Sequence, residues 1–545
     1  MAFNLLAEPW LPVRLRSGAR RWIRPAQIVA ELGDDFAVEP DWPRADFNIA
    51  TYELLIGLLT IALHPREHED WAGLWRTPPN VRALDEKFAA CAHAFDLDGE
   101  GPRFLQEFGR LEGNQSPIES LLIDSPGENG QKKNSDVLTH RGRYPALSLP
   151  AAAIALYTMQ AFAPPGGSGN RTSMRGGGPL TALAIPPALD QDRPTPLWFR
   201  VWANVSLRAE PPDLATRVFP WLAPRIAAAK GEKISETDPR VHPLHSFFGM
   251  PRRFHLVFSE QQMECPLLEI EAERVVTGVV QKRSGLDYGD WLHPLTPYRR
   301  KKEADSPYTA KPKTGRFGYR DWVATVVGDS TGKLRLAAKN IAAAREANRR
   351  REIVGTAPTA RAKIIIAGWA MSNMEAIEYL LAEEPLHLAD DPGLVEALDT
   401  LAREMARAGE EVHSALARAI KAALFGSDSK VATDKGVFEA ARVAFYTGTD
   451  AHFHNLLSEA ACVQSEDDFD KCEGALRERW RHCLREAALT EFDRAAPIPL
   501  GDPKKAESVV LGRAGLLSTL EGYGGAGAKL FETLRLITPK SSQPK

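Results

Sequence analysis

The sequence lacks the phosphate-binding loop of the common nucleotide hydrolases. Neither Gly-Lys-Ser nor Gly-Lys-Thr occurs in its 545 residues, and a Walker loop needs these residues to hold phosphate and magnesium. Cysteine is also scarce: the five residues are scattered and form no C-x-x-C pair, which is unlike a zinc or disulfide framework. We therefore expect reduced, mostly buried thiols and no cofactor.

Long apolar runs are absent as well. A membrane-spanning helix needs about 18 to 20 consecutive apolar residues, and no such run occurs. The first residues carry an acid and prolines and do not form a secretion signal. With the scattered thiols, these absences predict a cytoplasmic protein.

Metal ligands do not cluster in the sequence. His452 and His454 are two positions apart, so they cannot share one face of a helix. Cys472 and Cys483 are too far apart along a helix to bind one ion. We expect no metal site.

The chain is too long for one hydrophobic core, and its character changes near residue 388. Before that point, β-like runs at 198–206, 254–258 and 363–367 alternate with apolar helical runs at 50–63 and 151–162. We therefore predict an irregular domain of mixed strands and helices for the N-terminal part.

After residue 388, apolar residues recur at helical spacing in four stretches. The third has Ser465 as a cap, the fourth has Pro503 in its first turn, and Gly426 is a candidate C-cap for the first. The sequence thus predicts an α+β protein: a large irregular mixed α/β domain (1–388) followed by an antiparallel four-helix bundle (389–545).

One segment is unusually rich in glycine. Residues 163–180, APPGGSGNRTSMRGGGPL, contain six glycines, three prolines, two arginines and no acid. The segment starts a dinucleotide-binding pattern at Gly167, but Thr172 stands where the last glycine should be. We expect Arg171 and Arg175 to neutralise phosphates or to brace this segment.

Local positive charge is concentrated although the net charge of the chain is −3. Residues 281–320 hold ten Lys or Arg and four Asp or Glu, a net charge of +6. Such a patch on a near-neutral chain is typical of polyanion binding, although an exposed loop face has the same composition. Within the patch, 288–302 (YGDWLHPLTPYRRKK) interleaves aromatic and basic residues, which either stack on bases or pack on the core.

Residues 363–379 (KIIIAGWAMSNMEAIEY) begin as a strand and end in a polar turn. The residues alone favour a strand-to-helix turn capped by Ser372 or Asn373. The alternative is a hairpin whose tip could enter a base stack as a wedge.

Four motifs in order resemble the CasA family, the large subunit of the type I-E CRISPR Cascade surveillance complex. They are FNLLAEPWLPV (3–13), GMPRRFHL (249–256), HPLTPY (293–298) and GWAMSNMEA (368–376). The resemblance covers essentially the whole chain. It implies a subunit that is not an enzyme, that reads a protospacer-adjacent motif through the minor groove, helps to open the duplex, and docks a helicase-nuclease in antiviral defence.

The resemblance also implies site residues. The motif-reading glycine loop falls on Gly166, Gly167, Ser168 and Gly169, and a basic motif contact falls on Lys282 or Arg283. The hairpin wedge falls on Ser372 and Asn373, where some relatives carry Gln. A loop near the guide RNA falls on the following residues: Asn134, Val137, Leu138 and Thr139.

The partners implied are guide RNA, double-stranded target DNA, the helicase-nuclease and the other Cascade subunits, namely the backbone, the small subunit and the subunit that binds the guide's 5′ end. Two alternatives from other classes remain open. One is a phosphate- or nucleotide-processing enzyme that uses the glycine-rich loop, and the other is a scaffold that binds only proteins.

Overall fold

The computed structural model describes most of the chain as two units. The described residues are 2–134, 136–137, 139–166, 169–188, 193–208, 216–226, 232–329, 331, 333–354, 362–372, 374–389, 393–426, 430–433, 436–463 and 465–538. The first unit comprises residues 1–316 and 333–386, and the second, helical unit comprises 317–332 and 387–545.

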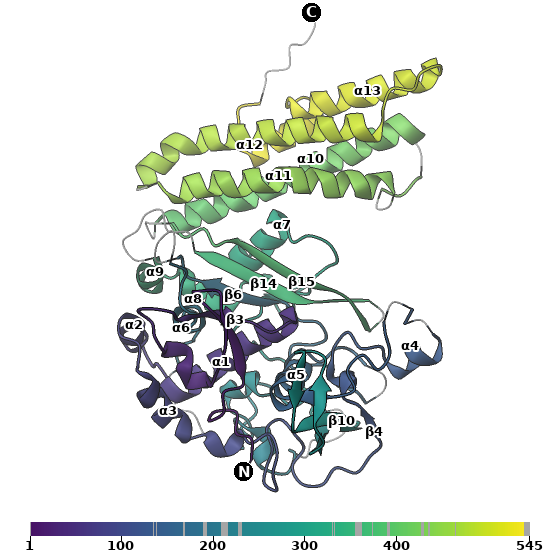
Figure 1. The fold of residues 1–545 in the computed structure, drawn as a ribbon. Coiled ribbons are helices and arrows are strands. Elements are labelled where there is room, and N and C mark those ends of the chain that lie inside the picture. Colours follow the sequence, from purple (N-terminus) through teal and green to yellow (C-terminus); the bar gives the residue numbers. More distant parts are fainter. Residues whose placement is uncertain are drawn as a thin grey trace, which may run out of the picture. The chain divides into compact units, whose positions relative to one another are not determined.

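The first unit combines small antiparallel sheets with short helices (Figure 1). Its sheets are β2-β1-β3, β4-β10-β5 with β7 paired to β10, β12-β11-β13, β15-β14-β6 and β8-β9. The shorter strands are β1 (Leu11–Leu15), β2 (Arg20–Ile23), β3 (Ala37–Pro40), β4 (Gln115–Pro117), β5 (Leu147–Ser148), β6 (Thr181–Ile185), β8 (Met263–Cys265), β9 (Ile270–Ala272), β11 (Tyr298–Arg299), β12 (Tyr308–Thr309) and β13 (Arg335–Leu336).

Two apolar helices, α1 (Ala45–Leu63) and α5 (Leu149–Phe162), form the core of this unit. They confirm the helices expected at 50–63 and 151–162. By length and composition α1 would be able to cross a membrane, but 83% of its apolar window is buried inside the fold, as in a core helix. Shorter helices surround the pair: α2 (His68–Arg76), α3 (Val81–Ala89), α4 (Glu128–Lys132), α6 (Leu197–Trp202), α8 (Lys339–Arg345) and α9 (Ala347–Val354).

Helix α6 corrects the strand expected at 198–206. Aromatic and β-branched residues favour strands in isolation, but here Trp198 and Trp202 are fully buried and stack on each other. Trp202 also stacks on Trp71 of α2, and each indole N–H donates to the other residue's carbonyl. Helical spacing puts both tryptophans on the same buried face, so tertiary packing overrides local propensity.

The longest strands are those that frame the site. Strands β7 (Arg253–Ser259) and β10 (Val275–Lys282) pair antiparallel, with Lys282 opposite Arg253. Strand β14 (Lys363–Ser372) pairs with β15 (Glu375–Pro385) to make a long hairpin. The strand expected at 363–367 is thus confirmed, but the strand-to-helix turn favoured after it is wrong. Pairing with β6 covers only residues 363–367 of β14, whereas pairing with β15 continues to Ser372 and makes a hairpin in place of the expected turn into a helix.

The helical unit contains four long helices that lie side by side in Figure 1. They are α10 (Leu394–Phe425), α11 (Val437–Ala461), α12 (Glu466–Ala495) and α13 (Pro503–Leu520). Ser465 and Asp502 accept hydrogen bonds from the first turns of α12 and α13, and Gly426 (φ 81°) ends α10. The α+β class is confirmed.

The helical unit contains more than the four helices that were expected. A fifth, short helix α14 (Gly524–Thr533) packs on α10 and α13. Residues 317–332, with α7 (Tyr319–Trp322) and the π-helical turn η6 (Val323–Val327), also belong to this unit.

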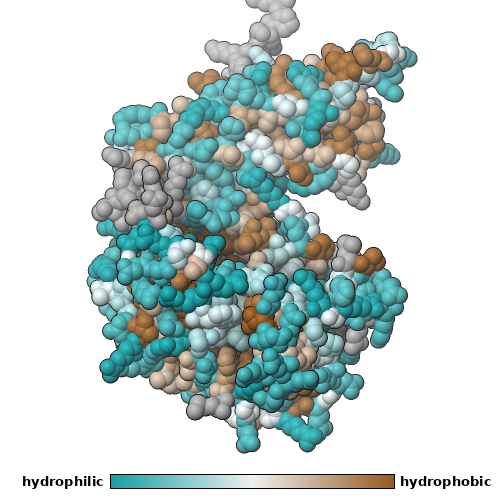
Figure 2. Space-filling view, in the orientation of Figure 1, coloured by the Kyte–Doolittle hydropathy of each residue, from teal (hydrophilic) through white to brown (hydrophobic). Residues whose placement is uncertain are grey.

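In Figure 2 the visible face of the first unit is mainly hydrophilic, and apolar side chains gather over α13.

Candidate nucleic-acid interface

The glycine-rich segment (residues 163–180) leaves the end of α5 and is closed at its base. Two prolines follow the helix, and proline cannot continue the backbone hydrogen bonds of a helix. The Ser173 N–H donates to the carbonyl of Ala163 over 3.0 Å. Of the glycine loop predicted to read DNA, Gly166 and Gly169 are described, whereas Gly167 and Ser168 lie outside the described residues.

Two positions of this segment require glycine, because neighbouring atoms lie too close to leave room for a side chain. Gly169 has φ +84°, and a Cβ there would lie 2.9 Å from Cβ of Arg283. Gly178 has φ +65°, and its Cβ would lie 2.6 Å from Cγ of Met371 on β14. A side chain would be strained and crowded at either position. The segment therefore lies directly against the end of β10 at one point and against the hairpin at the other.

The predicted basic pair is beside the loop. Strand β10 ends at Lys282, and both Lys282 and Arg283 are exposed. The Ser284 N–H donates to the Gly169 carbonyl (2.8 Å). The Gln281 side-chain amide donates to Asn170 (3.0 Å). The structure thus brings together two predicted parts of the site that are more than one hundred positions apart in the sequence.

The two arginines of the segment differ in their surroundings. Arg171 forms an ion pair with Asp287 (2.7 Å), and its side chain is 40% exposed, so it braces the loop while still facing solvent. Arg175 is 3% exposed, and its guanidinium donates to both carboxylate oxygens of Glu53 on α1, at 2.8 and 2.9 Å. Of the two roles expected for Arg175, phosphate neutralisation is wrong and bracing is right.

The environment of this buried pair is closed. Arg175 also bonds the hydroxyls of Thr181 and Thr296 and lies over the Phe162 ring. Burial raises the pKa of Glu53, and the charge of Arg175 opposes that rise. Burial, reinforced by Arg175, lowers the pKa of the adjacent His293 well below its usual range. His293 is therefore neutral, and Arg175 is held by its partners.

The β14–β15 hairpin supplies the third predicted part of the site. Ser372 is exposed and pairs with Glu375 at the end of the ladder. Asn373 lies outside the described residues. Met374 has φ 70° and is 60% exposed, which is unusual for a large apolar side chain. Among its described residues, the exposed tip therefore carries the polar side chains of Ser372 and Glu375 and the apolar side chain of Met374.

The loop expected near the guide RNA is folded on itself. The Arg141 guanidinium donates to Asn134 and to Asp136, and the Thr139 N–H donates to the Asp136 carbonyl. Val137 is 84% exposed, and Leu138 lies outside the described residues. In the part of the chain described, these hydrogen bonds stay within the loop and do not join it to the glycine-rich segment.

The aromatic residues of 288–302 belong to the core. Tyr288, Trp291 and Tyr298 are 8%, 3% and 5% exposed, so they cannot stack on bases. The Trp291 indole donates to Ile234, and the Tyr288 hydroxyl bonds His245 (2.8 Å). Of the two interpretations left open for this stretch, core packing is the one observed.

The lysines that follow are exposed, in contrast to these aromatics, whereas Arg299 and Arg300 are half-buried. Lys301, Lys302 and Lys311 surround the small β11–β12 ladder, in which Tyr308 is 48% exposed. This ladder is fixed to the glycine-rich segment, because the Thr309 hydroxyl donates to the Arg175 carbonyl (2.8 Å). A positively charged face thus adjoins the loop.

Arg252 is a site residue that the sequence did not single out. It lies beneath the loop, where its guanidinium donates to the carbonyls of Pro164 (2.7 Å) and Arg171 (3.2 Å). The motif GMPRRFHL contains it, but two adjacent arginines give no sign of which one is buried. Here Arg252 is 9% exposed, whereas Arg253 pairs with Glu107.

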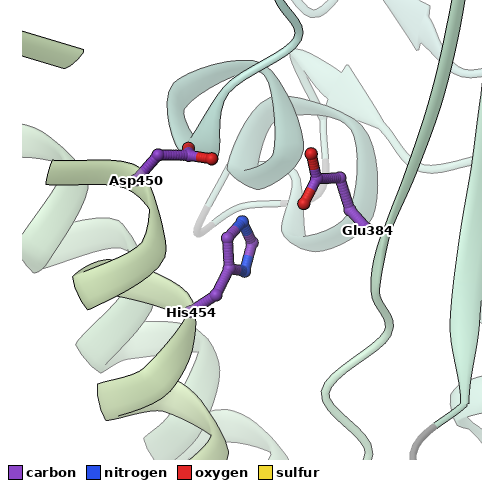
Figure 3. Close-up of side chains that lie close together, drawn as sticks. All are labelled: Glu384, Asp450 and His454. Atoms are coloured by element: carbon purple, nitrogen blue, oxygen red, sulfur yellow. The ribbon is translucent and has the colours of Figure 1, made fainter. Parts of the chain in front are cut away.

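In the helical unit, Asp450 and His454 project from one face of α11 (Figure 3). Asp450 accepts the Tyr319 N–H (2.8 Å), and a ring nitrogen of His454 bonds His387 (3.0 Å). The first of these bonds fastens residues 317–332 to α11, and the second joins α11 to the residue at the start of 387–545. Glu384, also drawn in Figure 3, belongs to the first unit.

Comparison with known proteins identifies the family. The family model for CRISPR-associated protein Cse1 matches residues 4–490. Among solved structures, Cse1 of Thermobifida fusca is 16% identical with a TM-score of 0.69, and the match covers 98% of each chain. CasA (Cse1) of Thermus thermophilus is 18% identical with a TM-score of 0.67, over 95% of this chain and 99% of that one.

A further match is a chain described as part of a CRISPR RNA-guided surveillance complex. It is 14% identical with a TM-score of 0.68, over 95% of this chain and 100% of that one. The class that the fold and the match define is therefore a CRISPR-associated protein. The chain belongs to the Cse1 family.

Proposed function

We propose that the chain is the non-catalytic large subunit of a CRISPR RNA-guided surveillance complex, and that it recognises a protospacer-adjacent motif in duplex DNA through the minor groove. Family membership and the likeness to a surveillance-complex chain support the assignment. One observation carries the site: Gly169 lies against Arg283, and Gly178 lies against Met371 of the hairpin. Loop, basic pair and wedge candidate thus meet in one unit.

The proposed mechanism is binding. Backbone without side chains can approach the floor of the narrow minor groove, where readout mainly separates A·T from G·C pairs. Lys282 and Arg283 add affinity by neutralising phosphates. A tolerant motif preference follows from this combination.

Opening of the duplex is assigned to the hairpin. Apolar side chains inserted between base steps unstack them, and Met374 offers such a side chain beside Asn373. The guide RNA then pairs with the opened strand and supplies target specificity. The guide RNA, the other complex subunits and a helicase-nuclease recruited after opening are the partners we propose, in the cytoplasm.

Two other motifs in the chain bear on the enzyme alternative. A G-x-S-x-G pentapeptide occupies 328–332, and a G-x-G-x-x-G pattern occupies 522–527. A nucleophile elbow needs a strand before its serine, whereas η6 precedes the first motif. A dinucleotide loop follows a strand, whereas α13 precedes the second. Neither context favours catalysis, and Arg175 is not available to bind a phosphate.

The direct test is Gly169→Ala in the assembled complex. Fluorescence anisotropy would give Kd for duplexes with and without the motif. We expect the ratio of the Kd without the motif to the Kd with the motif to fall by about tenfold, which corresponds to a loss of roughly 1.4 kcal/mol of close contact. Complex assembly should be unchanged.

Gly18→Ala is the matched control, because Gly18 has φ +87° but nothing within 4 Å of its would-be Cβ. It shares the backbone strain of Gly169→Ala without the crowding. Equal motif discrimination in the two variants would contradict the proposed role of the loop. A wild-type complex that does not distinguish the two duplexes would contradict the proposed function itself.

A further inference from the structure

Arg252 occupies an unusual position for an arginine. Its backbone is fixed by Gln160 of α5, whose side chain accepts the Arg252 N–H (3.1 Å) and donates to the Arg252 carbonyl (2.9 Å). Its guanidinium is fixed by the carbonyls of Pro164 and Arg171. These two residues flank the predicted groove-reading glycines, so one side chain joins the two arms of the loop.

The charge of Arg252 has no carboxylate partner among the described residues. Its bonds run to neutral carbonyl and amide groups, and burial alone lowers the pKa of Arg252 to about 10. Buried charges are normally paired, because removing an ion from water is costly. The neighbouring Arg253 follows that rule through Glu107 (2.9 Å).

The surroundings of the loop add to this unbalanced charge. The side chains that flank or bond it include four cations, Arg171, Arg252, Lys282 and Arg283, and one carboxylate, Asp287. Arg171 already pairs with Asp287. The remaining positive charge has a natural complement in the phosphates that border a minor groove.

We propose that Arg252 is a positioning residue of the motif-reading site: it ties the two arms of the glycine loop together, and its charge is balanced by a DNA phosphate when the loop enters the groove. This inference rests on the proposed function and adds a residue and an electrostatic role to it. The fork of the guanidinium suits the first task, because it reaches two carbonyls at once. The low local dielectric strengthens the second.

Two substitutions separate these tasks. Arg252→Gln keeps an amide donor and removes the charge, whereas Arg252→Lys keeps the charge and loses the fork. The control is the double variant Arg253→Gln with Glu107→Gln, which removes a balanced ion pair one residue away. The assay is the Kd of the assembled complex for motif and non-motif duplexes over a range of potassium chloride concentrations.

For Arg252→Gln we expect the slope of log Kd against log salt to fall by about 0.9, the value of one neutralised phosphate. For Arg252→Lys we expect an unchanged slope and a loss of motif discrimination of about tenfold, as for one lost hydrogen bond to a charged group. The control should match the wild type in both measurements.

The inference is overturned if both Arg252 variants match the control in slope and in discrimination. If Arg252→Gln does not assemble, Arg252→Lys decides alone, because wild-type discrimination in that variant overturns the tie between the two arms. A wild-type complex without motif preference would instead overturn the proposed function, and would do so before any variant is compared.

Discussion

Nη2 of Arg175 lies 2.8 Å from Oε1 of Glu53, and both side chains are at most 2% exposed. This ion pair joins the glycine-rich segment to the core helix α1. Its partners are 122 positions apart, so the pair fixes a loop that local sequence leaves free.

Breaking the pair should be costly. Arg175→Met leaves Glu53 buried without its cation, and we expect a loss of about 3–5 kcal/mol in the free energy of unfolding. The double variant with Glu53→Gln should recover part of that loss, because no buried charge remains. Urea unfolding of the full chain measures both, and equal stability of the single and double variants would argue against an interacting pair.

Arg283 and Lys282 should differ in their effect on DNA recognition. Arg283 lies against Gly169, so Arg283→Gln should reduce discrimination between motif and non-motif duplexes. Lys282→Gln should weaken binding to both duplexes alike and reduce the salt slope by about 1. Binding titrations at several salt concentrations distinguish the two, and a reversal of these effects would move the motif contact to Lys282.

The hairpin tip should act after binding. We expect Asn373→Ala to slow strand opening more than it weakens initial binding, because a wedge separates stacked base pairs only after the duplex is bound. Fluorescence of a base analogue next to the motif reports opening. A duplex with an unpaired bubble at that place should rescue the variant. Equal losses in binding and opening, or no rescue, would refute a wedge.

Acid should destabilise the first unit through buried histidines. Burial lowers the pKa of His245 from 6.5 to about 4, so below pH 6.5 the unfolded chain binds a proton that the folded chain does not accept. The free energy of unfolding should fall by about 1.4 kcal/mol per pH unit between these values. His245→Gln should flatten this dependence, as measured by urea unfolding at stepped pH.

The domain boundary predicted near residue 388 leads to a truncation test. A chain ending at Leu386 retains every described sheet and should fold, as judged by a cooperative thermal transition. It should also bind a hydrophobic dye, because Tyr319 and Trp322 lose contacts with Phe453, and Tyr319 loses Trp480. Replacing Tyr319 and Trp322 by serine should reduce dye binding. An unfolded product would show that the first unit depends on the second.

The sequence predicted elements whose signals are local. Amphipathic spacing, the cap Ser465 and Pro503 in a first turn located the helices α10 to α13. It failed where tertiary contacts decide: Trp202 stacks on Trp71, so 197–202 is a helix, and β14 pairs with β15 up to Ser372, so a hairpin forms where a turn into a helix was expected. The basic pair and the hairpin were assigned by resemblance. The burial of Arg175 and Arg252 was not visible, because nothing local marks an arginine as internal.

Residues 317–332 group with the helical unit although 333–386 return to the first unit. The polypeptide therefore passes between the units three times. If a single recombination event near residue 387 replaced the C-terminal helices by those of a relative, Tyr319 and Trp322 would pack against helices from a different protein. A functional chimera needs matched junctions near 316, 332 and 386, so the two units are expected to be inherited together.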